Sequence, residues 1–377
     1  MTGTIEPRCP YFGKCGGCTS QHIPYELQLE NKKKVIARAT AMPESEVQVF
    51  SGEPYNYRNR MDFIFRPGGL GFRKKGKWYE SVGVEQCPIS NEKLNQLLLE
   101  VNSAFKNIDS FDVKKHTGTF RYAVIRTPRK SSSISFVLNA DSLRLKEAIE
   151  KIQEYAKISR ADNILITRVP HNSDLSIGPD YFVVKGIEML EEEFLGMSFK
   201  FHAQGFFQNN SMMAEQMHNY VNKLLMAYDT KKSHLLDLYG GVGTFGIVNS
   251  KLFASTTIVE GVQECIAGAD INIADNCSEN VRAVLLDDKQ LSRLPLKAPL
   301  FVITDPPRSG MHPKTIAALN ALEPELIIYV SCNPQQLEKD LKHFKGYTIR
   351  SAALFDLFPH TPHMEGVVEL TKAQLTS

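Results

Sequence analysis

The sequence predicts an α/β fold, in which a C-terminal parallel sheet is covered by helices on both faces and is preceded by an α+β region. Two observations predict it. After about residue 200, short apolar segments typical of buried strands alternate with helical segments, which is the pattern of a parallel sheet. Before that point, strand-like segments are joined by turns such as Pro67-Gly68-Gly69. A chain of 377 residues is long enough for two or three domains.

The predicted elements follow the chain in a clear order. The helix at 25–40 places Leu27, Leu29, Val35 and Ile36 on a loosely apolar side. In the α+β region, further helices are expected at 91–106 and 141–157, and strands at 57–65, 70–73, 78–82, 120–127, 133–139, 164–169 and 181–184. In the C-terminal part, helices are expected at 211–228, 262–275, 313–322 and 334–343. Strands are expected at 234–239, 281–286, 301–305 and 326–331, and a further strand is expected to end at 259–260.

These elements predict three parts. Residues 1–48 form a cysteine-bearing loop and a connecting helix, residues 49–200 form a central α+β domain, and residues 201–377 form the domain with the parallel sheet. The composition is ordinary for a globular protein, with 42% hydrophobic and 23% charged residues, which excludes disorder and a bare coiled coil. No stretch approaches the roughly 18 apolar residues of a membrane span, and the N-terminus lacks a signal-peptide core. We expect a cytoplasmic protein with no membrane partner.

The net charge of +2 hides two basic segments. Residues 58–77 carry seven basic side chains against the single acid Asp62, and residues 114–130 carry six and no acid. Aromatic residues such as Phe72 and Trp78 are interleaved with them. Basic side chains neutralise phosphates and aromatic faces stack on unpaired bases, so we expect the central domain to bind RNA. The alternative is a pair of solvated hairpin faces.

A glycine-rich turn predicts a cofactor site. Gly241, Gly243 and Gly246 form G-x-G-x-x-G between a strand and a helix, and Glu260 ends the next strand, 19 positions after Gly241. Such glycines let a ligand approach the backbone, and the acid can hold a ribose diol. A nicotinamide dinucleotide satisfies this motif equally well. The Asp305-Pro306-Pro307 strand end in the same sheet instead favours an S-adenosylmethionine-dependent methyltransferase, unless it is a simple strand stop.

A thiol and a carboxylate follow at later strand ends. Cys332 lies between a predicted strand and a predicted helix, whose N-terminus should lower the thiol pKa and favour a nucleophilic thiolate. A small core residue is the alternative. Glu365 begins the last strand, where a partly dry site would raise its pKa and let it act as a base. His360 and His363 in the preceding loop are expected to pack or hydrogen-bond rather than to bind a metal.

The spacing of the cysteines favours a metal site. Cys9, Cys15 and Cys18 lie within ten residues of one another, whereas Cys87, Cys265, Cys277 and Cys332 are scattered. In a cytosolic chain such a grouping favours metal binding over disulfides. Thiolates suit both zinc and iron–sulfur sites, so the residues alone leave the metal open.

Together these motifs resemble the RNA (uracil-5-)-methyltransferases. The resemblance is carried by Phe206-Phe207-Gln208-Asn209-Asn210, DLYGGVGTF, DPPRSG, YVSCNP and DLFPHTPHMEGV, in that order. It implies a Rossmann-like methyltransferase sheet, a Cys332 nucleophile and a Glu365 base. It also implies that S-adenosylmethionine contacts Gln208, Tyr239, Glu260 and Asp305, with Asp287 or Asp288 as a weaker adenine-side candidate. A [4Fe–4S] cluster is implied at Cys9, Cys15, Cys18 and Cys87.

The chain departs from the family pattern in two places. Gly240 stands where the family commonly has a cysteine, and Cys9 leaves no room for the small N-terminal β-barrel (TRAM) of many members. The chain therefore resembles the shorter branch, which includes a 23S rRNA methyltransferase. We expect a monomeric enzyme that forms 5-methyluridine in RNA, with 23S rRNA as the first substrate candidate and a tRNA T-loop uridine as the second. Less favoured alternatives are an RNA cytosine-5 methyltransferase, an NAD-dependent oxidoreductase and a non-catalytic RNA-binding module.

Overall fold

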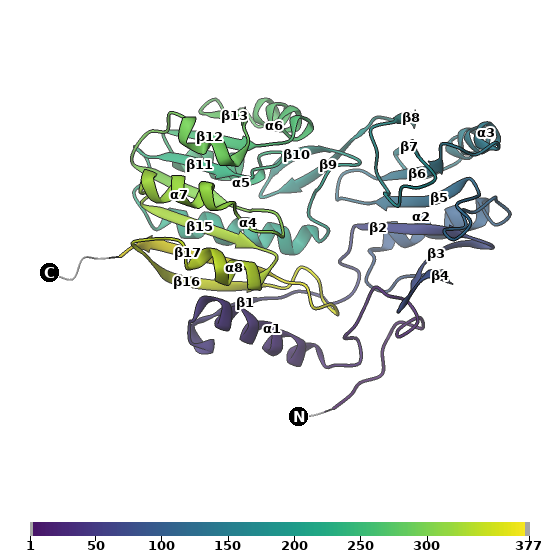
Figure 1. Ribbon diagram of the computed structural model, residues 1–377, viewed down its shortest axis with the longest axis horizontal. Coiled ribbons are helices and arrows are strands. Elements are labelled where there is room, and N and C mark those ends of the chain that lie inside the picture. The colour runs from purple at the N-terminus through teal and green to yellow at the C-terminus, as the bar shows by residue number, and fades with distance from the viewer. Residues whose placement is uncertain (1–2, 374–377) are drawn as a thin grey trace. The chain divides into compact units, whose positions relative to one another are not determined.

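The computed structural model describes residues 3–373, which divide into two compact units (Figure 1). The first unit contains the chain up to Tyr25, Glu53–Glu192 and His202–Ser211, and the second contains Glu26–Gly52, Glu193–Phe201 and the described residues from Met212 onward. The expected segment 1–48 is thus divided between the units, because the buried residues Ile36 and Ala37 pack in the core of the second. Within the described residues, no helix has the length and apolarity needed to cross a membrane.

The second unit is built on an eight-stranded sheet in the order β1-β16-β17-β15-β14-β11-β12-β13 (Figure 1). Its strands are β1 (Gln48–Phe50), β11 (His234–Leu238), β12 (Ser255–Glu260), β13 (Val281–Leu285), β14 (Leu300–Thr304), β15 (Leu326–Ser331), β16 (Tyr347–Phe355) and β17 (Glu365–Lys372). The strands from β13 to β15 are parallel, as the sequence predicts. The last strand, β17, differs because it runs antiparallel to both of its neighbours.

Helices cover both faces of this sheet, which confirms the predicted layers. The helices are α1 (Tyr25–Thr40), α4 (Ser211–Met226), α5 (Thr244–Asn249), α6 (Gln263–Asp275), α7 (Pro313–Leu322) and α8 (Pro334–Leu341), with short 3-10 turns at Glu44–Glu46, Ser250–Leu252 and Asp288–Arg293. Alternate strand residues enter two cores: Ile327 and Tyr329 pack with α1, α7 and α8, whereas Ile328 and Val330 pack with α4 and α5. This alternation is the period-2 pattern of a strand buried on both faces.

The first unit contains a seven-stranded sheet in the order β4-β3-β2-β5-β6-β7-β8. Its elements are β2 (Arg60–Arg66), β3 (Gly69–Lys74), β4 (Lys77–Gly83), α2 (Glu92–Ala104), β5 (Phe120–Arg126), β6 (Ser133–Asn139), α3 (Leu145–Ala156), β7 (Asn163–Val169) and β8 (Tyr181–Lys185). All neighbouring strands are antiparallel except β6 and β7, and side chains of α2 and α3 close the core. A separate hairpin of β9 (Met189–Phe194) and β10 (Met197–His202) follows, which the sequence analysis does not anticipate.

Candidate active site

Three of the expected cofactor residues lie at one edge of the second unit's sheet. In the parallel register, Leu238 of β11 pairs with Val259 of β12 and Thr304 of β14. The residues that follow these three, Tyr239, Glu260 and Asp305, therefore leave the sheet together at its carboxyl edge. Ligands bind at this edge in open α/β sheets.

The glycine turn after β11 has the tight conformation that its sequence predicts. Tyr239, Gly241 and Gly243 all have positive φ, at 60°, 55° and 89°. The backbone N–H of Gly241 donates to Oε2 of Glu260 over 3.0 Å, which ties the turn to the end of β12. At Gly240 a β-carbon would lie 2.6 Å from Cγ2 of Ile258, so this turn fits a glycine closely at the position where the family commonly has a cysteine.

A cavity of about 250 Å³ adjoins this turn, and its lining includes Tyr239, Glu260, Asp287 and Asp288. The Asp288 carboxylate is already engaged by neighbouring side chains. Its Oδ2 accepts from the Tyr239 hydroxyl over 2.7 Å and from the Thr315 hydroxyl over 2.5 Å. Oδ1 of Asp287 accepts from the nearby backbone N–H of Lys289 over 3.0 Å, and half of the Asp287 side chain is exposed. Of the two aspartates that the sequence left open, Asp287 is thus the freer to meet a ligand.

Cys332 and Glu365 lie on neighbouring strands. Ser331 of β15 pairs with Gly366 of β17 in antiparallel register, so the next pair of positions brings Cys332 opposite Glu365. Asp305 lies at the end of β14, the strand on the other side of β15. The three side chains perturb one another electrostatically, which confirms that the fold gathers the thiol and both acids at one place.

The electrostatics of this cluster contradict one expectation. Burial raises the pKa of the Cys332 thiol to about 11, and the charges of Glu365 and Asp305 act in the same direction. The predicted lowering by the helix that begins at Pro334 is therefore wrong for this state, because burial and two neighbouring acids outweigh it. The expected rise does occur at Glu365, where burial and the charge of Asp305 raise the carboxyl pKa. Burial also raises the pKa of Asp305 to about 7.

The loop that leads to Glu365 is held by α1, which the sequence analysis did not connect to the site. The ammonium of Lys32 donates to Oδ1 of Asp356 over 2.6 Å and to the carbonyl oxygens of Phe358 and His363 over 3.1 and 2.8 Å. The backbone N–H of His360 donates to Oε1 of Gln28 over 3.0 Å. No motif in the sequence indicates these partners, because they lie more than 300 positions from the loop.

Gln208 belongs to the first unit, whereas the other expected cofactor residues belong to the second. Its carbonyl oxygen accepts from Nδ2 of Asn59 over 3.3 Å, and the backbone N–H of Asn59 donates to the carbonyl oxygen of Asn209 over 2.9 Å. The Phe206–Asn210 motif is thus fixed to the start of β2, and the expected contact of Gln208 with a cofactor stays a prediction.

The four cysteines of the expected cluster all lie in the first unit. Burial raises the pKa of Cys9, Cys15 and Cys18, and the charge of Cys87 adds to each rise, so the four thiols lie close enough to interact. Side-chain oxygens fix the backbone of two of these cysteines. The backbone N–H of Cys87 donates to Oδ1 of Asn95 over 2.8 Å, and that of Cys9 donates to Oε1 of Gln21 over 3.0 Å. Nevertheless, no group of three or more His, Cys, Asp or Glu side chains in residues 3–373 is arranged to hold a metal ion.

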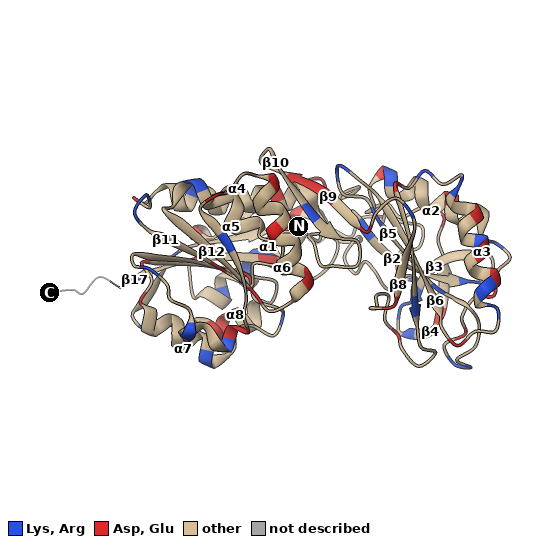
Figure 2. Cartoon of the chain, turned by 90° about the horizontal axis from the view of Figure 1, so that it is seen from above, with Lys and Arg blue, Asp and Glu red and all other residues tan. Residues whose placement is uncertain are grey.

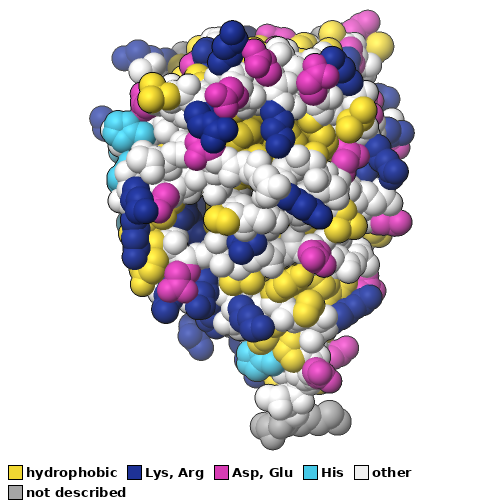
Figure 3. All heavy atoms as spheres, turned by 90° about the vertical axis from the view of Figure 1, so that its right-hand side faces the viewer, with side chains coloured by type: hydrophobic (Ala, Val, Ile, Leu, Met, Phe, Trp, Pro, Cys, Tyr) yellow, Lys and Arg dark blue, Asp and Glu magenta, His cyan; other side chains and the backbone are white. Residues whose placement is uncertain are grey.

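The two basic segments meet in the first unit's sheet, since β2 pairs with β5. They do not form an evenly solvated face. Arg126 is buried and donates to the carbonyl oxygens of Ala203 and Gly205, and Arg60 pairs with Asp62 over 3.0 Å. The space-filling view accordingly shows Lys and Arg side chains interspersed with acidic ones (Figure 3).

Comparison with known proteins identifies the family. The family model described as tRNA (Uracil-5-)-methyltransferase matches residues 24–373. The chain belongs to this family. It is therefore an RNA (uracil-5-)-methyltransferase, and the oxidoreductase and non-catalytic alternatives are wrong.

Individual relatives span nearly the whole chain. An "Uncharacterized RNA methyltransferase" of Caldanaerobacter subterraneus is 36% identical over 98% of this chain and 85% of its own length. A tRNA (uracil(54)-C(5))-methyltransferase of Pyrococcus abyssi is 32% identical over 97% of this chain and 86% of its own. The crystal structure of the Pyrococcus abyssi tRNA (uracil-54, C5)-methyltransferase with S-adenosyl-L-homocysteine covers 95% of this chain and 86% of its own, with a TM-score of 0.78 and 30% identity. This neighbour supports the methyltransferase fold.

Proposed function

We propose that this enzyme transfers a methyl group from S-adenosylmethionine to C5 of a tRNA T-loop uridine. The observation that carries the proposal is the similarity, over 95% of this chain, to a tRNA (uracil-54, C5)-methyltransferase crystallised with S-adenosyl-L-homocysteine. Relatives named for the same tRNA position cover 97–98% of the chain. These similarities favour tRNA over 23S rRNA, the first candidate from the sequence.

We propose that the carboxyl edge of the sheet holds the methyl donor. Tyr239, Glu260 and Asp287 line one cavity, and Asp305 follows the adjacent strand β14. In this arrangement Glu260 would hold the ribose hydroxyls, Asp287 the adenine side and Asp305 the reacting end, and Gln208 is proposed as a further contact. S-adenosylmethionine supplies an electrophilic methyl group and a sulfonium positive charge when it is bound.

In the proposed reaction, Cys332 is the nucleophile. Uracil C5 is a weak nucleophile, and a bond from Sγ of Cys332 to C6 makes C5 enolate-like, so that it can take the methyl group. A thiol with a pKa of about 11 is protonated at neutral pH. A bound sulfonium cation would lower the pKa of the thiol and of both neighbouring acids, so that the thiol proton passes to solvent before Sγ bonds to C6.

Glu365 completes the reaction. After C5 has gained the methyl group, the Glu365 carboxylate accepts the C5 proton, and the electrons of the C5–H bond restore the C5–C6 double bond as Sγ leaves C6. Its position opposite Cys332 suits this role, since the two groups must act on adjacent ring atoms. The target base must first leave its stack to enter the site.

We also propose that Cys9, Cys15, Cys18 and Cys87 hold a [4Fe–4S] cluster with a structural role. Four thiols that interact electrostatically supply a suitable donor set. Their thiolates would have to turn toward a common centre, because the described side chains are not in a ligand arrangement. No step of the methyl transfer uses this group.

Mass mapping of 5-methyluridine in tRNA and rRNA, with and without the gene, tests the substrate. The proposal predicts loss of the modification at one tRNA position and unchanged rRNA. Loss from 23S rRNA with unchanged tRNA would contradict the proposed substrate. Purified enzyme should also methylate an RNA whose only pyrimidine is uridine and not one whose only pyrimidine is cytidine, which excludes the cytosine-5 alternative.

A further inference from the structure

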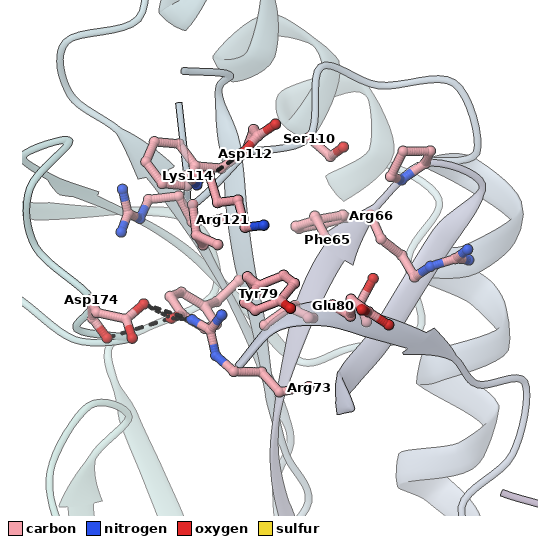
Figure 4. A pocket seen from close by; sticks show the side chains of 16 residues that line it. Phe65, Arg66, Arg73, Tyr79, Glu80, Ser110, Asp112, Lys114, Arg121 and Asp174 are labelled. Atoms are coloured by element: carbon pink, nitrogen blue, oxygen red, sulfur yellow. Dashed lines mark hydrogen bonds and ion pairs between the residues drawn. The ribbon is translucent and has the colours of Figure 1, made fainter. Parts of the chain in front are cut away.

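The first unit contains a cavity of about 540 Å³ (Figure 4). Its lining includes none of the residues that are expected to act in methyl transfer. Side chains of β2, β3, β4 and β5 and of the loop before β5 surround it, with Asp174 at one margin. In Figure 4, Arg66 and Asp174 lie on opposite sides, with Tyr79 between them. The volume is in the range of sites that enclose a small organic ligand or a single nucleotide.

An aromatic side chain is available in this cavity. Tyr79 is 42% exposed, and its neighbour Trp78 is 61% exposed. Both lie on β4, an edge strand of the sheet, so no further strand covers them. The ammonium of Lys114 lies over one face of the Tyr79 ring, 3.6 Å from its centre. A base that stacks on this ring therefore takes its other face, with the ammonium near enough to meet a phosphate.

The cavity's acids are already engaged, whereas its positive charge is in excess. Asp174 accepts from Arg73 over 2.8 Å and from the Tyr122 hydroxyl. Asp112 accepts from the backbone N–H of Lys114 over 2.9 Å. The third acid, Glu80, pairs with two lysines outside the cavity. The lining thus contains three acids and four basic side chains, those of Arg66, Arg73, Lys114 and Arg121. The cavity therefore offers positive charge to a ligand.

Two arginines in the wall retain unused donors. Nε of Arg66 and Nε of Arg121 are buried and have no hydrogen-bond partner among the described residues. Arg121 is only 4% exposed, and its guanidinium stacks 3.8 Å from the ring centre of Phe111. Buried donors without acceptors are costly, so an oxygen-rich ligand that let either side chain shift slightly would relieve this cost.

The path of Arg66 is set by glycines. A β-carbon at Gly83 would lie 2.6 Å from Nη1 of Arg66, and one at Gly71 would lie 3.0 Å from its Cδ. Arg66, at the margin of the cavity, can therefore run past β3 to Gly83 only because Gly83 has no side chain. This gives a way to move the guanidinium without changing any charge.

We propose that this cavity binds one unpaired nucleotide of the RNA substrate, distinct from the methylated uridine, with its base against Tyr79 and its phosphate beside Lys114 and Arg66. The proposal rests on the proposed function for the identity of the RNA. The combination of an exposed edge-strand aromatic ring, excess guanidinium and ammonium groups and unused arginine donors matches a nucleotide. An acidic peptide would need the charge but not the ring.

Binding of a fluorescent tRNA to the full-length enzyme, measured by anisotropy over a range of salt concentrations, tests this. Tyr79→Ala should weaken binding about tenfold, whereas Tyr79→Phe, which keeps the ring, should restore it. Lys114→Ala should weaken binding and reduce the salt dependence by about one phosphate contact. Gly83→Ala, which displaces Arg66, should act like Arg66→Ala. Lys146→Ala is the matched control, since that lysine is 90% exposed on α3 of the same unit.

Crosslinking locates the contact. With tRNA carrying photoreactive uridines, a crosslinked peptide from β4 or from residues 110–114 is expected. Wild-type affinity in the Tyr79→Ala and Lys114→Ala variants would overturn the inference, as would equal losses in Lys146→Ala. So would equal losses in Tyr79→Ala and Tyr79→Phe, which would leave the hydroxyl rather than the ring as the contact. Failure of the wild-type enzyme to methylate any tRNA would instead overturn the proposed function, and the two failures are distinguishable because binding and methylation are measured separately.

Discussion

The ammonium of Lys32 lies 2.6 Å from Oδ1 of Asp356, 324 positions further along the chain, and their side chains are 6% and 0% exposed. The same ammonium donates to two carbonyl oxygens of the loop that ends at Glu365. All three donors of the lysine are thus used on one loop. Burial lowers the pKa of Lys32, and Asp356 opposes this shift. The pair joins α1 to the segment that positions Glu365.

Replacing Lys32 with methionine should therefore destabilise the protein. The change leaves Asp356 buried without its cation, which costs about 3–5 kcal/mol in comparable cases. Denaturant unfolding measures the loss, and Lys34→Met, on the exposed side of the same helix, is the control. If Lys32 also positions Glu365, turnover at saturating substrates should fall more than the KM for either substrate rises. Unchanged stability in Lys32→Met would show that the ion pair does not hold the loop.

Cys332 and Glu365 should fail in different ways. Cys332→Ala removes the group that bonds to C6, so it should bind both substrates and yield neither methylated nor covalent product. Glu365→Gln keeps the nucleophile but cannot accept the C5 proton, so a protein–RNA adduct that survives denaturing gels should accumulate. Normal turnover by Glu365→Gln without a trapped adduct would remove the base assignment.

Cofactor affinity should depend on pH because of Asp305. Its raised pKa, about 7, means that the carboxyl loses its proton as the pH rises through neutrality. A bound sulfonium cation favours the ionised carboxylate, so S-adenosylmethionine should bind more tightly as the pH rises through the pKa of Asp305, with Glu365 acting in the same direction. Titration calorimetry with S-adenosyl-L-homocysteine, whose sulfur is neutral, is the control. The same pH dependence for both ligands, or no flattening in Asp305→Asn, would contradict this.

Gly240→Ala should be costly although the family often has a larger residue there. The added β-carbon would lie 2.6 Å from Ile258 Cγ2 and 2.9 Å from Asp237 Oδ2, so the turn or the core must move. Overpacking of this kind costs about 1–3 kcal/mol. Gly261→Ala is the matched control for stability, because the nearest atom to its β-carbon is 3.9 Å away. Equal melting temperatures for the two variants would mean that the turn relaxes freely.

The cysteine site should hold iron rather than zinc. Protein purified without oxygen is expected to contain iron and sulfide, about four of each per chain, with visible charge-transfer absorbance. Because the group is proposed as structural, removing it should lower stability of the first unit more than the intrinsic rate of methyl transfer. Zinc without iron in the anaerobic protein would overturn the choice of metal.

Local patterns were sufficient to predict most of the fold. Strands 133–139 and 326–331 and helices 25–40 and 313–322 have the predicted bounds. The predicted apolar side of helix 25–40 is wrong, however, because Val35 is exposed and the buried face includes Gln28 and Lys32 beside Ile36. The β9 strand was missed because Glu191, Glu192 and Glu193 hide its alternation, and Figure 2 shows the strand in red. Glu192 is nevertheless fully buried, where it accepts from the Ser211 hydroxyl.

The candidate site was predictable as a set of strand ends but not in its electrostatics. The order of motifs predicts that Tyr239, Glu260 and Asp305 meet, because parallel strands end at one edge. The direction of the Cys332 pKa depends instead on two acids that approach from other strands. Nothing in the sequence around Lys32 predicts that this lysine is buried, because its partner Asp356 is 324 positions away.

The release of tritium from [5-³H]uridine-labelled tRNA tests the central claim most directly. Methylation at C5 must expel the C5 hydrogen, so the purified enzyme with S-adenosylmethionine should release one tritium for each methyl group transferred. Cys332→Ala should release none, and Glu365→Gln should release far less than one per adduct formed. Methyl incorporation into the same tRNA without tritium release would place the reaction at another atom and contradict the account.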